Sequence, residues 1–221
     1  ANVLSGGLGS DVYYVGAGDS VVELAGGGSD IAYSGVSWIL EANVEYLSLT
    51  GSAAINGSGN ELNNYLYGTG NSAANVLSGG LGSDVYYVGA GDTVVEQVGE
   101  GTDSVYSAGD LSLTANVENL YLNVTTAATL IGNELANRLR GNAGDDMLVS
   151  LAGNDSLDGG LGADTLVGGS GSDNYTVDNA NDRVVELVDE GSDLVYSSVG
   201  WALGANVENL YLTGSAAING S

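Results

Sequence analysis

A nine-residue repeat constrains the fold more strongly than any other feature of this chain. Five nonapeptides follow one another without a gap between residues 132 and 176, and each has aspartate or asparagine at its sixth position. They read GNELANRLR, GNAGDDMLV, SLAGNDSLD, GGLGADTLV and GGSGSDNYT. The glycines permit positive φ and close packing of turns, and the apolar residue two places after the aspartate points into a narrow core. Each nonapeptide is therefore predicted to form a turn and a short strand, and two nonapeptides to complete a coil of about 18 residues.

Longer repeats in the rest of the chain fit the same coil. ANVLSGGLGSDVYYVGAGD begins at Ala1 and again at Ala74, an offset of 73 residues. ANVEYLSLTG at 42–51 returns in similar form at 115–124 and again, 90 residues later, at 205–214. These offsets are close to four and five coils of about 18 residues, so the third copy is predicted to have gained one coil. Growth by whole coils is typical of a solenoid.

The repeats also predict how the chain is organised. TGSAAINGS at 213–221 is identical to 50–58, where the first copy continues into GNELNN, so the chain stops within a repeat. We expect a single β-roll fragment of a longer repeat array over residues 1–221. Its repeat units are expected at approximately 1–73, 74–163 and an incomplete 164–221.

The charge of the chain excludes some partners and requires others. The net charge is -25, and Arg138, Arg140 and Arg183 are the only basic residues. Neither nucleic acid nor an anionic membrane suits such a surface, and no apolar run approaches the roughly 18 residues of a spanning helix, so membrane insertion is not expected. Such a charge ordinarily signals disorder, yet 43% of the residues are hydrophobic and lie in strand-like runs. We therefore expect an ordered β protein whose acids are neutralised by bound cations.

The nonapeptides resemble the calcium-binding repeats of the RTX family, whose pattern is G-G-x-G-x-D-x-U-x. The best matches are GGLGSDVYY at 6–14 and 79–87, GGLGADTLV at 159–167 and GGSGSDNYT at 168–176. The resemblance implies an all-β fold, a right-handed parallel β-roll or β-solenoid, with Ca2+ held between turns stacked on one edge. It also implies an extracellular protein, secreted by a bacterium to the cell surface or medium, that folds on meeting calcium.

The resemblance further implies which residues hold the metal, together with turn carbonyl oxygens. The expected ligands in the nonapeptides are the sixth-position residues, with Asp146 paired to Asp164, Asp155 paired to Asp173, and Asn137 beside Asp155. GGGSD at 26–30 is a degenerate copy of the same turn, which extends the expected sites to Asp11 with Asp30, Asp84 with Asp103, and Asp193. Oxygen ligands suit calcium, whereas zinc or copper would call for the absent histidine or cysteine.

Other recurring polar and aromatic residues have two interpretations each. Asp19, Asp92 and Asp182 are expected to cap turns rather than bind metal. Glu45, Glu118 and Glu208 could form a second cation row, but the alternation around them favours solvent-facing strand positions. The tyrosines, Trp38 and Trp201 could offer a platform to a surface polysaccharide, but core or edge packing is favoured.

Two functions remain open. Without histidine, cysteine or lysine the chain has no ordinary nucleophile and base, so no enzyme activity is expected in it. The first function is a structural cell-surface protein, such as an adhesin stalk, surface-layer component or filament, which contacts further repeats or copies of itself. The second is the non-catalytic calcium-binding tail of a secreted protease, lipase or polysaccharide-modifying enzyme. The recurring inserts between nonapeptide blocks favour the first.

Overall fold

The computed structural model describes residues 1–214 and 217–221, and within them it contains strands and turns but no helix. The strands are two to four residues long and pair in parallel with the strand one coil away, as Leu139 does with Leu157. The predicted all-β fold of parallel coils spaced about 18 residues apart is therefore confirmed. Ser215 and Ala216, in the last predicted repeat, lie outside the described residues.

The chain divides into two compact units, which are Ala1–Tyr106 with Thr114–Asn116 and Ser107–Leu113 with Val117–Ser221. We call them unit 1 and unit 2. They do not correspond to the predicted repeats, whose boundaries remain a prediction. No helix in the described parts of either unit is long and apolar enough to cross a membrane.

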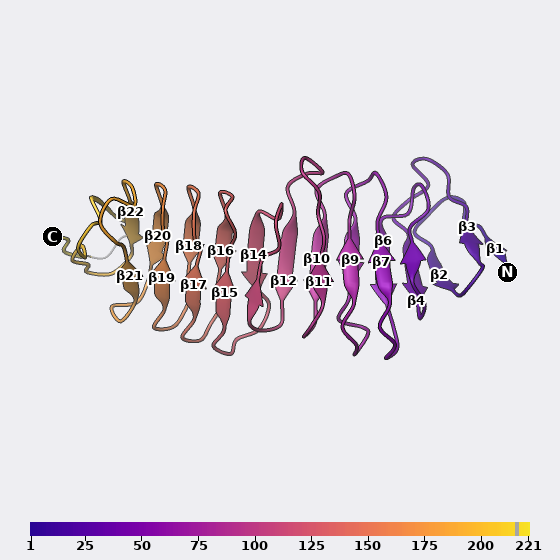
Figure 1. The fold of residues 1–221 in the computed structure, drawn as a ribbon, viewed down its shortest axis with the longest axis horizontal. Coiled ribbons are helices and arrows are strands. Elements are labelled where there is room, and N and C mark those ends of the chain that lie inside the picture. The colour runs from indigo at the N-terminus through magenta and orange to yellow at the C-terminus, as the bar shows by residue number, and fades with distance from the viewer. Residues whose placement is uncertain (215–216) are drawn as a thin grey trace. The chain divides into compact units, whose positions relative to one another are not determined.

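Unit 2 contains the five consecutive nonapeptides of 132–176, and the last three residues of each lie in a strand. One row of strands comprises β14 (Asn119–Leu122), β16 (Arg138–Arg140), β18 (Ser156–Asp158), β20 (Asn174–Val177), β22 (Leu194–Ser197) and β23 (Asn209–Leu212). The facing row comprises β13 (Leu111–Ser112), β15 (Thr129–Ile131), β17 (Met147–Val149), β19 (Thr165–Val167) and β21 (Arg183–Val185). Figure 1 shows β16, β18 and β20 side by side in one row and β15, β17 and β19 in the other.

In unit 2 each short strand contributes one buried side chain to a narrow core. The central residue of each short strand is fully buried and its two neighbours face outward, which is the alternation of a half-buried strand. The buried residues are Leu130, Leu139, Leu148, Leu157, Leu166 and Tyr175. Five of them stand two places after a sixth-position residue, as the nonapeptide pattern predicts.

Unit 1 has the same construction, with strands of two to four residues. One row comprises β2 (Val12–Val15), β4 (Ile31–Ser34), β6 (Tyr46–Leu49), β8 (Tyr65–Tyr67), β10 (Val85–Val88) and β12 (Ser104–Ser107). The others are β1 (Val3–Leu4) with β3 (Ser20–Val21), and β5 (Trp38–Ile39), β7 (Asn56–Ser58), β9 (Val76–Ser78) and β11 (Thr93–Val94). Leu47, Leu66, Leu77 and Tyr86 are fully buried between them.

The spacing of coils departs from the predicted 18 residues outside the nonapeptides. Ile31 pairs with Tyr46 only 15 residues later, whereas Tyr65 pairs with Val85 after 20. The short coil is possible because Asn43 of the ANVE motif adopts a positive φ of 68°, which asparagine tolerates better than most residues. Asn116 and Asn206 repeat this conformation.

The tyrosines divide into two sets that the sequence does not separate. Tyr86 and Tyr175 are buried, and so is Trp38, which confirms the expected core packing for these residues. Tyr14 is 77% exposed and stacks on Tyr33 with ring centroids 5.4 Å apart, so it packs on the outer face of the sheet and not in the core. The difference arises because neighbouring strand residues face opposite sides of the sheet.

Candidate metal centre

A row of acidic side chains follows the edge of unit 2 where β18, β20 and β22 begin. Asp155, Asp173 and Asp193 each stand directly before one of these strands. The Oδ1 atom of each aspartate accepts the backbone N–H of the equivalent residue one coil earlier. Asp155 N donates to Asp173 over 2.7 Å, and Asp173 N donates to Asp193 over 2.8 Å. We call such a row a carboxylate ladder.

A second carboxylate ladder follows the opposite edge of unit 2, before β17, β19 and β21. Asp146 N donates to Asp164 Oδ1 over 2.8 Å, and Asp164 N donates to Asp182 Oδ1 over 3.0 Å. The structure thus brings together both pairs predicted in the nonapeptides, Asp146 with Asp164 and Asp155 with Asp173.

Unit 1 repeats the ladder outside the uninterrupted nonapeptides. Asp11 N donates to Asp30 Oδ1 and Asp84 N to Asp103 Oδ1, each over 2.8 Å. The two residues of each pair are 19 apart, one coil, and each directly precedes a strand. The degenerate turns therefore place their aspartates as the nonapeptides do.

The second carboxylate oxygen of many ladder aspartates is buried without a hydrogen-bond partner. Such Oδ2 atoms belong to Asp11, Asp30, Asp84, Asp155, Asp164, Asp173 and Asp193. A buried ionised carboxylate is costly unless it is paired, and the three arginines of the chain are far too few. Arg140, for example, pairs with the outward-facing Asp158 over 3.3 Å.

The turn glycines leave room for these oxygens. A Cβ added to Gly159, the first residue of its nonapeptide, would collide with Asp164 Oδ2, and one added to Gly168 would collide with Asp173 Oδ2. Each glycine therefore permits the carboxylate of its own turn to lie over the backbone. Unpartnered carboxylate oxygens in an open turn of this kind fit calcium, which takes six to eight oxygen ligands.

Asn64 and Asn137 occupy ladder positions, and their side-chain polar atoms are satisfied within the protein. Asn137 Oδ1 accepts the Asn133 N–H over 2.6 Å, and its Nδ2 donates to the Val117 carbonyl over 3.2 Å. Asn64 makes the equivalent bonds, with Asn60 and Val44. Asn137 thus lacks the unpartnered oxygen of the neighbouring aspartates, and its role as a ligand remains a prediction.

Asp19, Asp92 and Asp182 combine two roles. Their Oδ2 atoms accept N–H groups of their own turns, from Gly16, Gly89 and Asn179 respectively, which confirms the predicted capping. Their Oδ1 atoms accept N–H groups one coil earlier, from Asn2, Asn75 and Asp164, and so also extend the ladders.

Glu45 and Glu208 also take part in the ladders. Glu45 Oε2 accepts the Asp30 N–H and Glu208 Oε2 accepts the Asp193 N–H, each over 2.9 Å. The prediction that these glutamates only face solvent is therefore incomplete, because their carboxylates also bind the backbone of the ladders. In the 15-residue coils the longer glutamate side chain reaches the position that an aspartate holds elsewhere.

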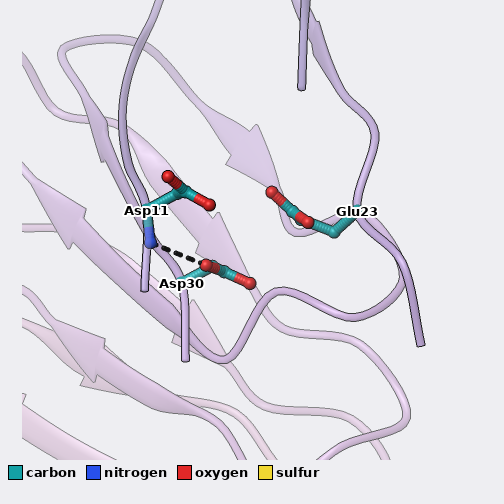
Figure 2. Close-up of side chains that lie close together, drawn as sticks. All are labelled: Asp11, Glu23 and Asp30. Carbon is teal, nitrogen blue, oxygen red and sulfur yellow. Dashed lines mark hydrogen bonds between the residues drawn. The ribbon is translucent and has the colours of Figure 1, made fainter. Parts of the chain in front are cut away.

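Three further glutamates lie at the ladders and were not predicted as metal ligands from the sequence. Their carboxylates lie within 4.8 Å of those of two aspartates, in the groups Asp11–Glu23–Asp30, Asp84–Glu96–Asp103 and Asp173–Glu186–Asp193. Figure 2 shows the first group, with Glu23 reaching from the opposite side toward Asp11 and Asp30. A signal was present, because the glutamate precedes the second aspartate by seven residues in all three groups.

Burial raises the pKa of many of these carboxyl groups. Loss of hydration raises the pKa of Asp84 to about 7 and those of Glu96 and Glu186 to about 8. The same cause raises the pKa of Asp155, Asp164 and Asp173 to about 6, and backbone N–H donors partly oppose it. Nearby acids add to the increase at Asp84, Glu96 and Glu186.

These pKa values predict that protons and calcium compete. A carboxyl group whose pKa is raised in the folded state costs stability only at a pH where it must ionise. These groups therefore do not destabilise the metal-free fold below about pH 4, the ordinary carboxyl pKa, and they destabilise it progressively as the pH rises toward 8. Calcium requires the ionised groups, so in chelator the chain should keep more of its β signal at about pH 5.5 than at about pH 8, and calcium that binds to the protonated fold should release protons. Circular dichroism in chelator at these two pH values measures the first effect, and proton release on addition of calcium at about pH 5.5 measures the second. Calcium binding without proton release at that pH would show that the buried carboxyls do not take up the metal.

Comparison with known proteins agrees with this arrangement. The family model described as RTX calcium-binding nonapeptide repeat (4 copies) matches residues 1–22 and 58–95, and in overlapping placements 131–166, 140–175 and 149–184. Together these segments cover slightly more than half of the chain. No curated protein is significantly similar to it.

Proposed function

The chain belongs to the family of RTX calcium-binding nonapeptide repeats, and from this premise we propose that it is a structural module of a secreted bacterial cell-surface protein. It binds Ca2+, and in the proposed function it folds when it meets extracellular calcium. The parent protein is proposed to be an adhesin stalk, a surface-layer component or an extracellular filament.

The observation that carries this proposal is the carboxylate ladder, which is built into both the nonapeptides and the long inserts. Buried carboxylates such as those of Asp84 in unit 1 and Asp155 in unit 2 have an oxygen without a partner. A bound cation would neutralise these buried charges, which the three arginines of the chain cannot do. A module of this kind is rigid where calcium is abundant and unfolded where it is scarce.

The long inserts favour a surface structure over the tail of an enzyme. Each insert adds coils and strands to the stack, and its sequence recurs in similar form, as ANVEYLSLTG at 42–51 does at 115–124 and 205–214. Repetition of this kind lengthens a solenoid without adding a new chemical group. Further repeats, or further copies of the chain, are the partners that we propose. In the proposed function the ladder aspartates with an unpartnered oxygen hold metal, and no catalytic role is assigned to them.

Imaging of the native parent protein tests this proposal. Antibodies against the chain should label the outer surface of the cells in calcium medium, and a calcium chelator should release or disperse the label. Magnesium at the same concentration should not restore it, because Mg2+ requires stricter octahedral geometry and keeps its water. A soluble parent with a hydrolase domain would instead support the enzyme-tail function, and binding to purified surface polysaccharide would identify that as the partner.

A further inference from the structure

We propose that the three Asp–Glu–Asp groups are a second class of calcium site, distinct from the nonapeptide sites because a glutamate supplies a third carboxylate. This inference rests on the calcium binding in the proposed function and adds the identity of three particular sites. The groups are Asp11–Glu23–Asp30, Asp84–Glu96–Asp103 and Asp173–Glu186–Asp193.

The register of the strands places the glutamate where a nonapeptide has its first glycine. Val76 pairs with Thr93 and Leu77 with Val94, so Glu96 stands one coil above Gly79. Glu96 Oε1 accepts the Gly79 N–H over 3.1 Å. Glu23 binds the Gly6 N–H in the same way over 3.2 Å. The glutamate thus turns back toward the aspartate of the preceding nonapeptide.

Oxygens without partners are aimed into these groups. Glu96 is 4% exposed and its Oε2 atom has no hydrogen-bond partner, and Asp84 is fully buried with its Oδ2 atom equally unpartnered. Glu186 Oε2 and Asp173 Oδ2 repeat this in the third group. Three carboxylates within 4.8 Å of one another repel strongly, and a divalent cation between them would satisfy the free oxygens.

The backbone holds the glutamate in place through the next coil. Asn116, the positive-φ asparagine of an ANVE motif, donates from Nδ2 to the Glu96 carbonyl over 2.9 Å. Asn43 and Asn206 bind the carbonyls of Glu23 and Glu186 in the same way, each over 3.1 Å. The same contact in three copies anchors the backbone of each glutamate in the folded coil, which reduces the ordering that the ligand needs when the ion binds.

The turn that carries the glutamate is longer than a nonapeptide turn. Seven residues separate Glu96 from Asp103, whereas five separate Gly79 from Asp84. The two turns nevertheless stack closely, because Gly82 N donates to the Glu100 carbonyl over 2.7 Å and a Cβ on Gly101 would collide with the Gly82 carbonyl. The extra length therefore accommodates the glutamate without separating the coils.

The glutamates lie outside the segments that match the nonapeptide family. These segments end at residues 22 and 95, directly before Glu23 and Glu96, and at 184, two residues before Glu186. Each site therefore joins one aspartate of a family repeat to a glutamate and an aspartate beyond it. Because calcium affinity rises with the number of charged ligands, we expect these three sites to fill before the two-aspartate sites.

Calcium binding by the full chain with all three glutamates replaced tests the proposal. Glu23→Gln, Glu96→Gln and Glu186→Gln together keep the side-chain shape and remove three charges. The matched control is Glu61→Gln, Glu134→Gln and Asp189→Asn, which removes the same charge from exposed positions. Isothermal titration with calcium alone should show three tight sites in the unchanged chain and the control. In the glutamate variant these sites should be weaker by about tenfold or more.

The outcomes separate this proposal from the proposed function. Equal affinity and equal ion count in the two variants would overturn the second class of site while calcium-dependent folding stands. Absence of calcium binding by the unchanged chain would overturn both. If the triple variant does not fold at millimolar calcium, the three single variants provide the test. Each single variant should bind one tight calcium ion fewer than the unchanged chain. A folded single variant that binds the full number of tight calcium ions would contradict the proposal.

Terbium adds a readout of position. The buried Tyr86 and Tyr175 hydroxyls donate to Glu96 and Glu186, so a terbium ion in these groups would lie beside a phenol that can sensitise its emission. Tyrosine-excited terbium emission should appear with the first ions bound and should fall in the glutamate variant but not in the control. Emission that is equal in both variants would place the first ions elsewhere.

Discussion

Removing calcium should unfold most of the chain. The ladder aspartates stack about 4.8 Å apart, the spacing of adjacent strands, and several of them present a buried oxygen with no partner. Without the cation these charges repel one another along the edges of a narrow core, and a net charge of -25 opposes compaction further. Circular dichroism should lose the β signal in chelator at neutral pH and regain it in millimolar calcium.

The pH and the choice of ion provide the controls for this experiment. Sodium chloride of equal ionic strength should restore little structure, because screening acts weakly on buried pairs. Magnesium should also be a poor substitute. A β signal that survives thorough chelation at pH 8, where the groups of raised pKa are ionised, would mean that apolar burial alone holds the coils together.

Replacing Asp155 with alanine should weaken calcium binding by about tenfold or more, and replacing Asp19 should weaken it far less. Asp155 is fully buried, its Oδ1 atom holds the Asn137 N–H over 2.6 Å, and its Oδ2 atom has no partner within the protein. Asp19 has both oxygens engaged, by Asn2 and by Gly16. Its loss should therefore remove a turn cap rather than a metal ligand. Isothermal calcium titration of the two variants measures the difference.

Replacing Asp155 with asparagine removes the negative charge and keeps the shape of the side chain. Asn137 shows that an amide fits a ladder position when backbone groups satisfy it. The Asp155→Asn chain should therefore fold at high calcium yet bind the ion more weakly than the unchanged chain. Equal losses in the Asp155→Ala and Asp19→Ala chains would show that the assignment of sixth positions to metal sites is wrong.

Regular spacing explains why the ladder pairs could be predicted from the sequence. Nine-residue steps put Asp146 and Asp164, or Asp155 and Asp173, one coil apart on the same edge, and the hydrogen bonds between them follow from strand pairing alone. The degenerate turns at Asp30 and Asp103 were predictable for the same reason, since each keeps the spacing of about one coil.

The sequence by itself determined the parallel coil, the buried residue two places after each aspartate and the need for a cation, because a short-period repeat fixes which residues stack. Only the tertiary structure decided what the irregular coils do. The register of β9 and β11 brings Glu96 over Gly79, and the short coil at the positive-φ Asn43 brings Glu45 to the Asp30 N–H. The seven-residue spacing marks Glu96 and its equivalents in the sequence, but it does not reveal which backbone groups they bind, because that depends on how one turn bends over another.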